Sequence, residues 1–460
     1  MSRAKAISRV NEHFHSGEFL AGLDRMVTYK TESQNPGHAD DLLAYLEQEL
    51  QPAFSSLGFS AKLIDSPTGR GPYLLAEYHE SPSAPTVLIY GHGDVVSGME
   101  GEWRDNLDPW RATKVGDRIY GRGTADNKGQ HAINLSALRA VHEIRGGRLG
   151  FNAKFIVETG EEIGSPDLRQ VCEGLRNALK ADLFLASDGP RLSAERPTIF
   201  LGCRGGVRIH LDVDLRDGSH HSGNWGGLLA NPATILASAI ASLVDRQGRL
   251  LLDELKPPRI SNQIRAALAD VKIEPMPDEP ALSADWGEEG LSATERLYAW
   301  NTLEVLAISA GNLQNPANAI PGRAGAVLQL RFVVGTDVDN VVPAIQRHFE
   351  RSGFSDVRVS SSQNFAASRT DLDNRWVGWA VDSIRTTTGK EPALLPNFGG
   401  SLPNDVFSEV LGLPTIWVPH SYPGCSQHAP DEHILMSVTE EALGMMAGLF
   451  WDLGETARPS

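Results

Sequence analysis

Residues 84–97 read APTVLIYGHGDVVS, and the order of apolar and polar residues in this stretch determines the predicted fold. The apolar run before Gly91 is typical of a strand that is buried on both faces of a sheet. His92 and Asp94 follow directly at the end of that strand. A buried strand that ends in ionisable side chains predicts a functional site at the edge of the sheet.

The first 200 residues alternate between short apolar runs and longer helical patterns, which is typical of an α/β sheet covered by helices. The predicted helices are residues 40–59 and 128–144, and the predicted strands are residues 85–92, 151–159 and 181–189. These elements form one layered domain.

The pattern changes near residue 205. Residues 205–216 and 324–334 alternate strictly between apolar and polar, as half-exposed antiparallel strands do. Helical patterns at 231–245 and 338–350 accompany them, residues 246–300 are expected to be an irregular decoration, and the α/β pattern returns after 368. We therefore predict an α+β domain, residues 205–367, inserted into an α/β domain of residues 1–204 and 368–460.

The composition excludes some partners. The 460 residues carry a formal charge of −16, whereas nucleic acids and anionic membranes reward Lys and Arg. No stretch has the length of a membrane span or the apolar core of a signal peptide. The three cysteines are an odd number and far apart, which argues against a disulfide framework. We expect a cytoplasmic protein that binds neither nucleic acid nor membranes.

Ionisable side chains follow one predicted strand after another in the α/β domain. Because the carboxyl ends of parallel strands meet at one edge of a sheet, we expect these side chains to converge. They are His92 and Asp94, Glu161 and Glu162 in VETGEEIGS, Asp188 in ASDGP, and His428 in SQHAPDEH, together with Asp126 in the glycine-rich loop YGRGTADNKGQ.

Imidazoles and carboxylates at one edge suit a binuclear divalent-metal site, because each ion needs N and O ligands and one carboxylate can bridge two ions. Asp94 is placed to orient the ring of His92. Of two adjacent glutamates, one can bind metal while the other acts as general base.

Each motif alone has a simpler interpretation. A single His-x-Asp is more often a hydrogen-bonded structural histidine, and paired glutamates are mostly solvated. Asp126 could cap the following helix, and Asp188 could be a turn residue. Cys425 lies three residues before His428, but its Pro-Gly turn suits a bystander. The joint occurrence of five metal-compatible positions in one domain favours the metal site.

These motifs together resemble the M20 metallopeptidases, which include carnosinase-type dipeptidases, succinyl-diaminopimelate desuccinylase, acetylornithine deacetylase, aminoacylase and glutamate carboxypeptidase. The resemblance covers nearly the whole chain in order and spacing. It rests on YGHGDVV, the segment 103–130, GEEIGS, SDG and QHAPDE. It implies that the first domain is catalytic, with a mixed sheet covered by helices, and that the insert is a lid and dimerisation domain.

The resemblance also implies individual roles. His92 and Asp188 would hold one zinc, Glu162 and His428 the other, and Asp126 would bridge the two ions; cobalt or manganese could replace zinc. Glu161 would be the general base and Asp94 the orienter of His92. The Asp126–Asn127 peptide bond would be cis.

The lid would contribute the remaining residues. HSGNWGG matches a lid motif in which His221, and not its neighbour His220, would stabilise the oxyanion in the partner subunit of a homodimer. Residues 318–334 resemble the strand that carries a carboxylate-binding arginine, which predicts Arg331, with Asn318 as a second candidate. The stretch FGGSLPND predicts substrate contacts at Gly400 and Ser401.

We expect a zinc-dependent hydrolase that cleaves the amide bond of dipeptides or N-acyl amino acids. The long lid and residues 298–311 favour the dipeptidase branch. Two alternatives remain open at this stage: a metal-dependent deacylase or carbamate or ester hydrolase with a non-peptide substrate, and a non-catalytic binding protein on the same fold.

Overall fold

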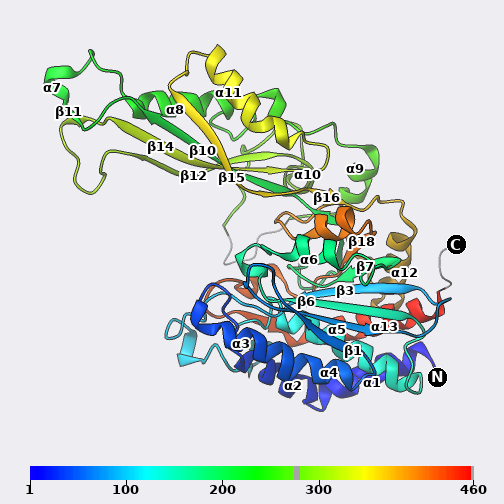
Figure 1. Cartoon of the computed structure of the whole chain (residues 1–460). Helices are drawn as coiled ribbons and strands as arrows, with labels where there is room; N and C mark the ends of the chain where they lie inside the picture. The colour runs from blue at the N-terminus through cyan, green and yellow to red at the C-terminus, as the bar shows by residue number, and fades with distance from the viewer. Residues whose placement is uncertain (274–279, 457–460) are drawn as a thin grey trace. The chain divides into compact units, whose positions relative to one another are not determined.

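The computed structural model describes residues 1–273 and 280–456, which divide into two compact units. Unit 1 contains residues 1–201, 370–395 and 405–460 (Figure 1). Unit 2 contains residues 202–369 together with residues 396–404. The limits of the inserted lid and dimerisation domain, residues 205 and 367, stay a prediction. Among the described residues, no helix is long and apolar enough to cross a membrane.

Unit 1 is built on a mixed eight-stranded sheet with the order β1-β2-β6-β3-β7-β18-β8-β17. The central strands β6, β3, β7 and β18 run parallel, and β1 and β2 form an antiparallel edge. The strands are β1 (Ser60–Ile64), β2 (Tyr73–Tyr78), β3 (Thr86–His92), β6 (Asn152–Glu158), β7 (Leu183–Ala186), β8 (Thr198–Phe200), β17 (Ala393–Leu395) and β18 (Thr415–Trp417). A small sheet contains β4 (Thr113–Val115), β5 (Arg118–Tyr120) and β19 (His433–Leu435).

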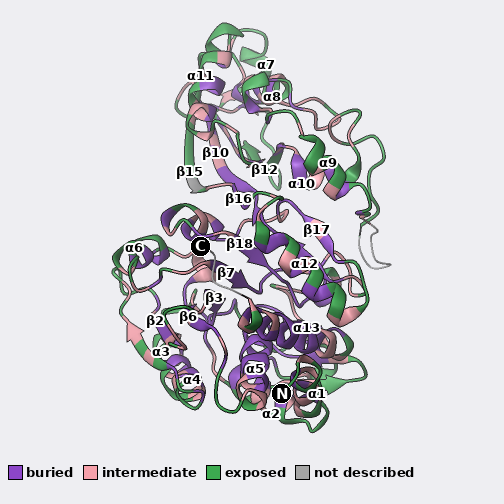
Figure 2. Cartoon of the chain, turned by 90° about the vertical axis from the view of Figure 1, so that its right-hand side faces the viewer, coloured by how far each residue is buried: buried purple, intermediate pink, exposed green. Residues whose placement is uncertain are grey.

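Helices cover this sheet and bury its central strands (Figure 2). Helix α13 packs against α1, α5 and α12, helix α1 also contacts α5, and α5 packs on β3. The helices of unit 1 are α1 (Arg3–His15), α2 (Glu18–Thr28), α3 (Ala39–Ala44), α4 (Gln51–Ser55), α5 (Lys128–Ile144), α6 (Leu168–Gly174), α12 (Arg375–Thr388) and α13 (Met436–Glu455). Every residue of β3 is buried, which agrees with the continuous apolar run in its sequence.

Unit 2 has a four-stranded antiparallel sheet with the order β12-β14-β10-β15. Alternate residues of β10 and β14 pack with apolar residues of α8 and α11 in one core. Its strands are β9 (Gly202–Cys203), β10 (Gly205–Asp214), β11 (His220–His221), β12 (Thr302–Ala310), β13 (Ala319–Ile320), β14 (Arg323–Phe332), β15 (Val357–Phe365) and β16 (Ser368–Arg369). Its helices are α7 (Ser222–Trp225), α8 (Pro232–Leu243), α9 (Asn262–Leu268), α10 (Ala293–Ala299) and α11 (Val341–Arg351).

Residues 246–300, expected to be irregular, contain α9 and α10 among their described residues. Ser292 begins α10 through a capping box, in which its side chain accepts from the Glu295 backbone N–H and the Glu295 carboxylate accepts from the Ser292 N–H. The Ser-x-x-Glu pattern of a capping box is readable in the sequence, so this helix could have been predicted.

An aromatic cluster packed against the central sheet of unit 1 allows a test of how much buried aromatic side chains stabilise that unit. Phe184 is buried and stacks on Phe407 with 4.1 Å between ring centroids, and Trp417 packs at 5.2 Å. We expect Phe184→Ala to lower the free energy of unfolding by about 3–5 kcal/mol, because it removes a buried ring and leaves a cavity. Chemical denaturation followed by tryptophan fluorescence measures this. Val115→Ala at an exposed site is the control and should change stability by less than about 0.5 kcal/mol.

Candidate metal centre

The parallel strands of unit 1 deliver ionisable residues to one edge of the sheet. His92 is the last residue of β3, Glu161 and Glu162 lie in the turn after β6, and Asp188 follows β7 by two residues. His428 lies in the connection between β18 and β19. These positions come together because β3, β6, β7 and β18 all end at the same side of the sheet.

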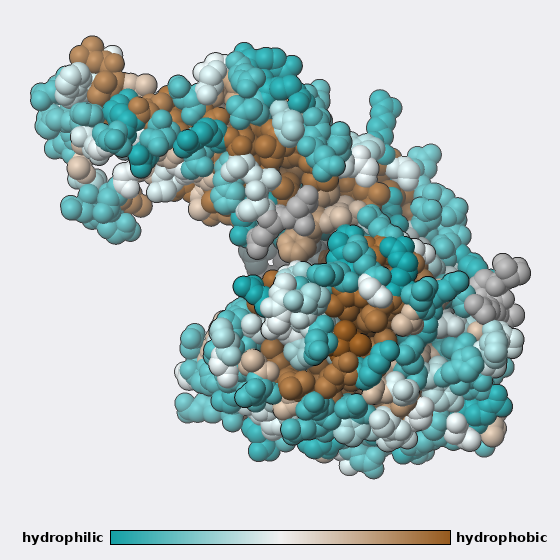
Figure 3. Space-filling model, in the orientation of Figure 1, coloured by the Kyte–Doolittle hydropathy of each residue, from teal (hydrophilic) through white to brown (hydrophobic). Residues whose placement is uncertain are grey.

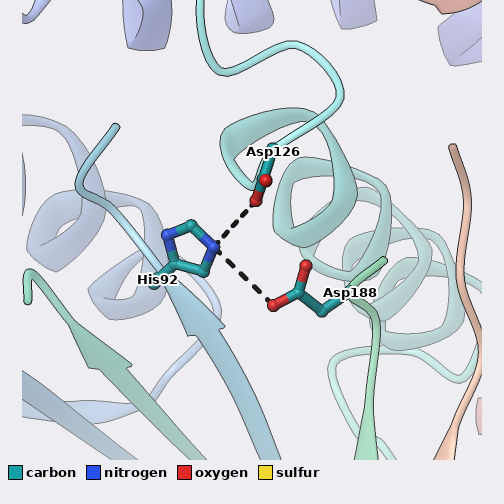
Figure 4. Close-up of side chains that lie close together, drawn as sticks. All are labelled: His92, Asp126 and Asp188. Atoms are coloured by element: carbon teal, nitrogen blue, oxygen red, sulfur yellow. Dashed lines mark hydrogen bonds and ion pairs between the residues drawn. The ribbon is translucent and has the colours of Figure 1, made fainter. Parts of the chain in front are cut away.

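A first group of possible metal ligands contains His92, Asp126 and Asp188, all buried. The Nε2 atom of His92 lies 3.0 Å from Asp126 Oδ1 and 3.7 Å from Asp188 Oδ2 (Figure 4). The three side chains come from β3, from the loop before α5 and from the residues after β7, and they point toward one another. Asp188 also accepts the N–H of Gly189 at 2.6 Å, so it is both a turn residue and a member of this group.

A second group contains Asp126, Glu162 and His428. The Nε2 atom of His428 lies 3.1 Å from Asp126 Oδ2 and 3.0 Å from Glu162 Oε2. Asp126 therefore belongs to both groups and turns a different carboxylate oxygen toward each histidine. Asn127, and not Asp126, is the N-cap residue of α5, and the Asp126–Asn127 peptide bond is cis.

The electrostatics of this cluster suit cations. Burial and the nearby Asp126 carboxylate raise the pKa of Asp188 to about 6 and that of Glu162 to about 7. Burial likewise raises the pKa of Glu161. Oε1 of Glu162 is buried without a hydrogen-bond partner among the described residues. Carboxylates buried side by side repel one another, and a divalent ion relieves that repulsion, so the N and O donor set fits a metal.

Asp94 connects the two sides of the cluster. Its carboxylate accepts the backbone N–H groups of Glu161 at 3.2 Å and Glu162 at 3.0 Å. Nδ1 of His92 lies 3.1 Å from the backbone oxygen of Asp94 and 3.5 Å from its carboxylate. This arrangement leaves Nε2 of His92 turned toward Asp126 and Asp188. Asp94 therefore positions the turn of the two glutamates as well as the histidine.

Glu432 fixes the loop that carries Asp126, and the sequence reasoning assigned it no role. Its buried carboxylate accepts the backbone N–H groups of Gly123, Ala125 and Asp126 at 2.9–3.1 Å. It also forms a buried ion pair with Arg122 at 2.7 Å. The signal in the sequence is its place in QHAPDE, four residues after His428.

The residues predicted to bind substrate all lie in unit 2. Nη1 of Arg331 donates to Ser401 Oγ at 2.7 Å, and Gly400 precedes that serine. His221 pairs with Ala319 across β11 and β13, so it lies beside Asn318, whose carbonyl accepts the N–H of Ser222. His221 is exposed, and its Nδ1 accepts the N–H of Gly223 at 3.1 Å. Cys425 is buried, and burial raises the pKa of its thiol to about 12, which argues against a role as a thiolate metal ligand.

The sequence model described as Peptidase family M20/M25/M40 matches residues 88–452. The chain belongs to this peptidase family. Human Beta-Ala-His dipeptidase is 26% identical over 472 residues, covering 96% of this chain and 91% of that protein. The Cys-Gly metallodipeptidase of Schizosaccharomyces pombe is 26% identical over 365 residues, covering 74% of this chain and 73% of that protein.

Solved structures of M20 peptidases share the fold. An M20 family metallo-carboxypeptidase from Sulfolobus solfataricus superposes with a TM-score of 0.80 at 26% identity, covering 95% of this chain and all of that one. Human carnosine dipeptidase 1 gives a TM-score of 0.79 at 24% identity, with 99% of each chain covered. The predicted family, the α/β fold class with a second α+β unit, and the assignment as a peptidase-type hydrolase are thereby confirmed.

The contacts of Glu432 predict a test in this M20 peptidase. Glu432→Gln should lower the free energy of unfolding by about 3–5 kcal/mol, because it leaves the buried Arg122 without its counter-charge. It should also lower the metal content of the protein, because the loop that carries Asp126 loses an acceptor. Thermal unfolding and elemental analysis measure the two effects. Glu455→Gln, which alters an exposed ion pair with Arg145, is the control, and equal effects of the two variants would contradict the assigned role.

Proposed function

We propose that the protein hydrolyses the amide bond of dipeptides or N-acyl amino acids at a pair of divalent metal ions, with zinc as the native metal and cobalt or manganese as substitutes. The observation that carries this proposal is the shared Asp126 carboxylate, which turns one oxygen toward His92 and the other toward His428. Dipeptidase relatives, acting on Beta-Ala-His and on Cys-Gly by their names, support a dipeptide substrate.

Five side chains would hold the ions: His92 and Asp188 on one, Glu162 and His428 on the other, and Asp126 between them. Divalent ions at such a site act as Lewis acids toward a carbonyl oxygen and make water easier to deprotonate near neutral pH. The donor groups lie within 4.8 Å of one another in each set, which supports this assignment.

Glu161 is the proposed general base. It lies beside the proposed ligand Glu162, and its backbone N–H is held by Asp94, which keeps the turn in place. Glu161 takes a proton from the attacking water as the new C–O bond forms at the substrate carbonyl. It then gives that proton to the leaving amine as the C–N bond breaks. The products are a carboxylic acid and an amine.

Removal of metal tests the proposed function. Purified protein should lose activity on a panel of dipeptides and N-acyl amino acids after treatment with a chelator, and regain it with zinc, cobalt or manganese. Elemental analysis should report the metal content of each sample. Undiminished hydrolysis by protein with less than about 0.05 metal ions per chain would overturn the proposal, because a metal site cannot act without its metal.

Substitution of the two neighbouring glutamates should have different effects. Glu161→Gln should lower kcat by about a hundredfold or more while both metals stay bound, because only the proton acceptor is lost. Glu162→Gln should lower metal occupancy, because a ligand oxygen is replaced by an amide nitrogen. If Glu161→Gln loses metal and Glu162→Gln keeps it, Glu161 is the ligand and Glu162 the base, which contradicts the proposed roles.

The outer edge of the unit 2 sheet supports a homodimer. Strand β12 is an edge strand, and Val305, Leu306 and Ile308 on it are 44%, 54% and 56% exposed. Apolar surface is visible on this unit (Figure 3). An exposed edge strand with apolar side chains is a template for pairing with another chain. We propose that a second copy of the protein covers it, and that the dimer is cytoplasmic, in line with its three free cysteines.

Unit 2 supplies the proposed substrate contacts. Arg331 would bind the substrate carboxylate, because a guanidinium matches the planar, bidentate geometry of a carboxylate. Ser401 shares a hydrogen bond with Arg331, and Gly400 lies beside it. Asn318 and His221 lie on neighbouring segments and would act on the site of the partner subunit, with His221 as the oxyanion donor.

A mixing experiment tests whether His221 acts across the dimer. His221→Ala should keep its fold and metals but lose about a hundredfold or more in turnover, because an oxyanion donor acts mainly in the transition state. Subunits carrying His221→Ala are then exchanged with subunits carrying Glu161→Gln. A hybrid dimer contains one site with intact Glu161 and a His221 from its partner, so activity should return.

His220→Ala is the matched control, because it alters the neighbouring histidine and should leave turnover unchanged. Subunit exchange is monitored with differently labelled subunits. Demonstrated exchange without recovered activity would refute action across the dimer, and so would an active enzyme that is strictly monomeric.

A further inference from the structure

Unit 2 contains a cavity of about 560 Å³ that is lined by both charged and apolar side chains. Arg204, Arg331 and Glu304 contribute charged side chains to its lining, and Trp286, Leu297 and Trp300 contribute apolar surface. The cavity therefore combines a pair of guanidinium groups with room for a large apolar group. Only Arg331 of these residues has a role in the function proposed above.

The strand pattern explains why Arg331 faces this cavity. Its neighbours Leu330 and Phe332 are buried in the core with α8 and α11, so Arg331 lies on the opposite face of the sheet. It pairs with Thr302 on β12 and with Gly206 on β10. A Cβ atom on Gly206 would lie 2.9 Å from Gln329 Nε2 and 3.6 Å from Arg331 Nη1 and Ser401 Oγ, so the glycine lets these side chains pack close to the backbone of β10.

Arg204 is a buried cation with unused donors. It is 6% exposed, and its Nε donates to the carbonyl of Gly399 at 2.9 Å. Its Nη1 atom is buried without a hydrogen-bond partner among the described residues, and the same is true of Nε1 of Trp300. A buried charged donor without a partner is costly. One charged and one neutral donor without a partner, on two residues that line the same cavity, point to a ligand that accepts hydrogen bonds.

The charges around the cavity favour an anion. Three arginines and two glutamates line it, and Arg296 among them donates to backbone carbonyls of Trp286 and Glu288. Burial and the neighbouring charge of Arg331 lower the pKa of Arg204 to about 10. Arg204 and Arg331 therefore repel each other, and an anion between them would relieve that repulsion.

We propose that Arg204 and Arg331 together bind the C-terminal carboxylate of the substrate, and that Leu297, Trp300 and Trp286 receive a bulky apolar side chain on the same residue. This proposal rests on the function above, in which Arg331 meets that carboxylate. It adds a second guanidinium and predicts a preference for large apolar residues at the C-terminal position. Carboxylates are commonly bound by guanidinium groups, and apolar side chains gain from burial against aromatic rings.

A competing role for Arg204 is purely structural. Its backbone and side chain hold the loop of Gly399 and Ser401, since Ser401 Oγ donates to its carbonyl and its Nε donates to Gly399. A structural role would affect all substrates alike. A carboxylate-binding role would affect only substrates with a free carboxylate, and this difference is the basis of the test.

The test compares alanyl-phenylalanine, its C-terminal amide and alanyl-glycine as substrates of the zinc-loaded protein. The wild-type protein should prefer alanyl-phenylalanine to both others in kcat/KM. Arg204→Gln should lower kcat/KM for the free acid by about 10- to 100-fold and for the amide by less than about twofold, because a hydrogen bond to a charged group is lost only with the acid. Arg204→Lys should fall between wild type and Arg204→Gln.

Arg323→Gln is the matched control, because Arg323 is an exposed arginine of the same unit, on the strand of Arg331, and pairs with Asp214. It should leave both rates unchanged. Equal losses for acid and amide in Arg204→Gln would overturn the proposal, as would a wild-type protein that does not distinguish acid from amide or that prefers alanyl-glycine.

If no peptide is hydrolysed, the proposed function fails, and binding then tests the cavity separately. Calorimetry with 3-phenylpropionate and 3-phenylpropionamide should detect binding of the acid alone, and Arg204→Gln should weaken it by about tenfold or more. Equal binding of the two compounds, or no binding of the acid, would overturn the assignment of the cavity.

Discussion

The candidate metal centre of unit 1 depends on the carboxylate of Asp126, which faces two imidazoles at once. Its two oxygens lie 3.0 Å from His92 and 3.1 Å from His428, although these histidines are more than 300 residues apart in the chain. One carboxylate can satisfy both only if the ends of β3 and β18 and the loop before α5 meet at one point. The parallel central sheet provides this meeting point, because its strands end at the same side.

Around Asp126, buried hydrogen bonds restrict the loops that carry the other groups. Glu432 binds the N–H of Asp126 itself, Asp94 binds the N–H groups of Glu161 and Glu162, and Nδ2 of Asn127 donates to the carbonyl of Ser187. Like-charged carboxylates are thus held close together because the backbone N–H groups of their loops donate to the buried carboxylates of Glu432 and Asp94. Such preorganisation leaves the free energy of repulsion available for binding cations.

The sequence predicts the local features well. Strand β3, helix α5 and the alternating strands β10 and β14 follow from apolar periodicity alone, because burial imposes that periodicity directly. The strand-end residues can be predicted as well, because they follow directly after these apolar runs. The motif QHAPDE marks the position of Glu432 but not its contacts, because no local pattern encodes hydrogen bonds to residues as distant as Gly123, Ala125 and Asp126. The proposed role of Arg204 cannot be predicted from the sequence either, because it depends on the burial of this side chain beside the cavity of unit 2.

Anomalous X-ray diffraction from zinc-loaded crystals tests the central claim most directly, because it locates each ion and identifies the element. We expect two zinc peaks about 3.5–4 Å apart, the separation typical of two-metal sites, with one oxygen of Asp126 bound to each. His92 and Asp188 should complete the contacts of one ion, and Glu162 and His428 those of the other. A single zinc ion, or two ions that do not share Asp126, would contradict this account.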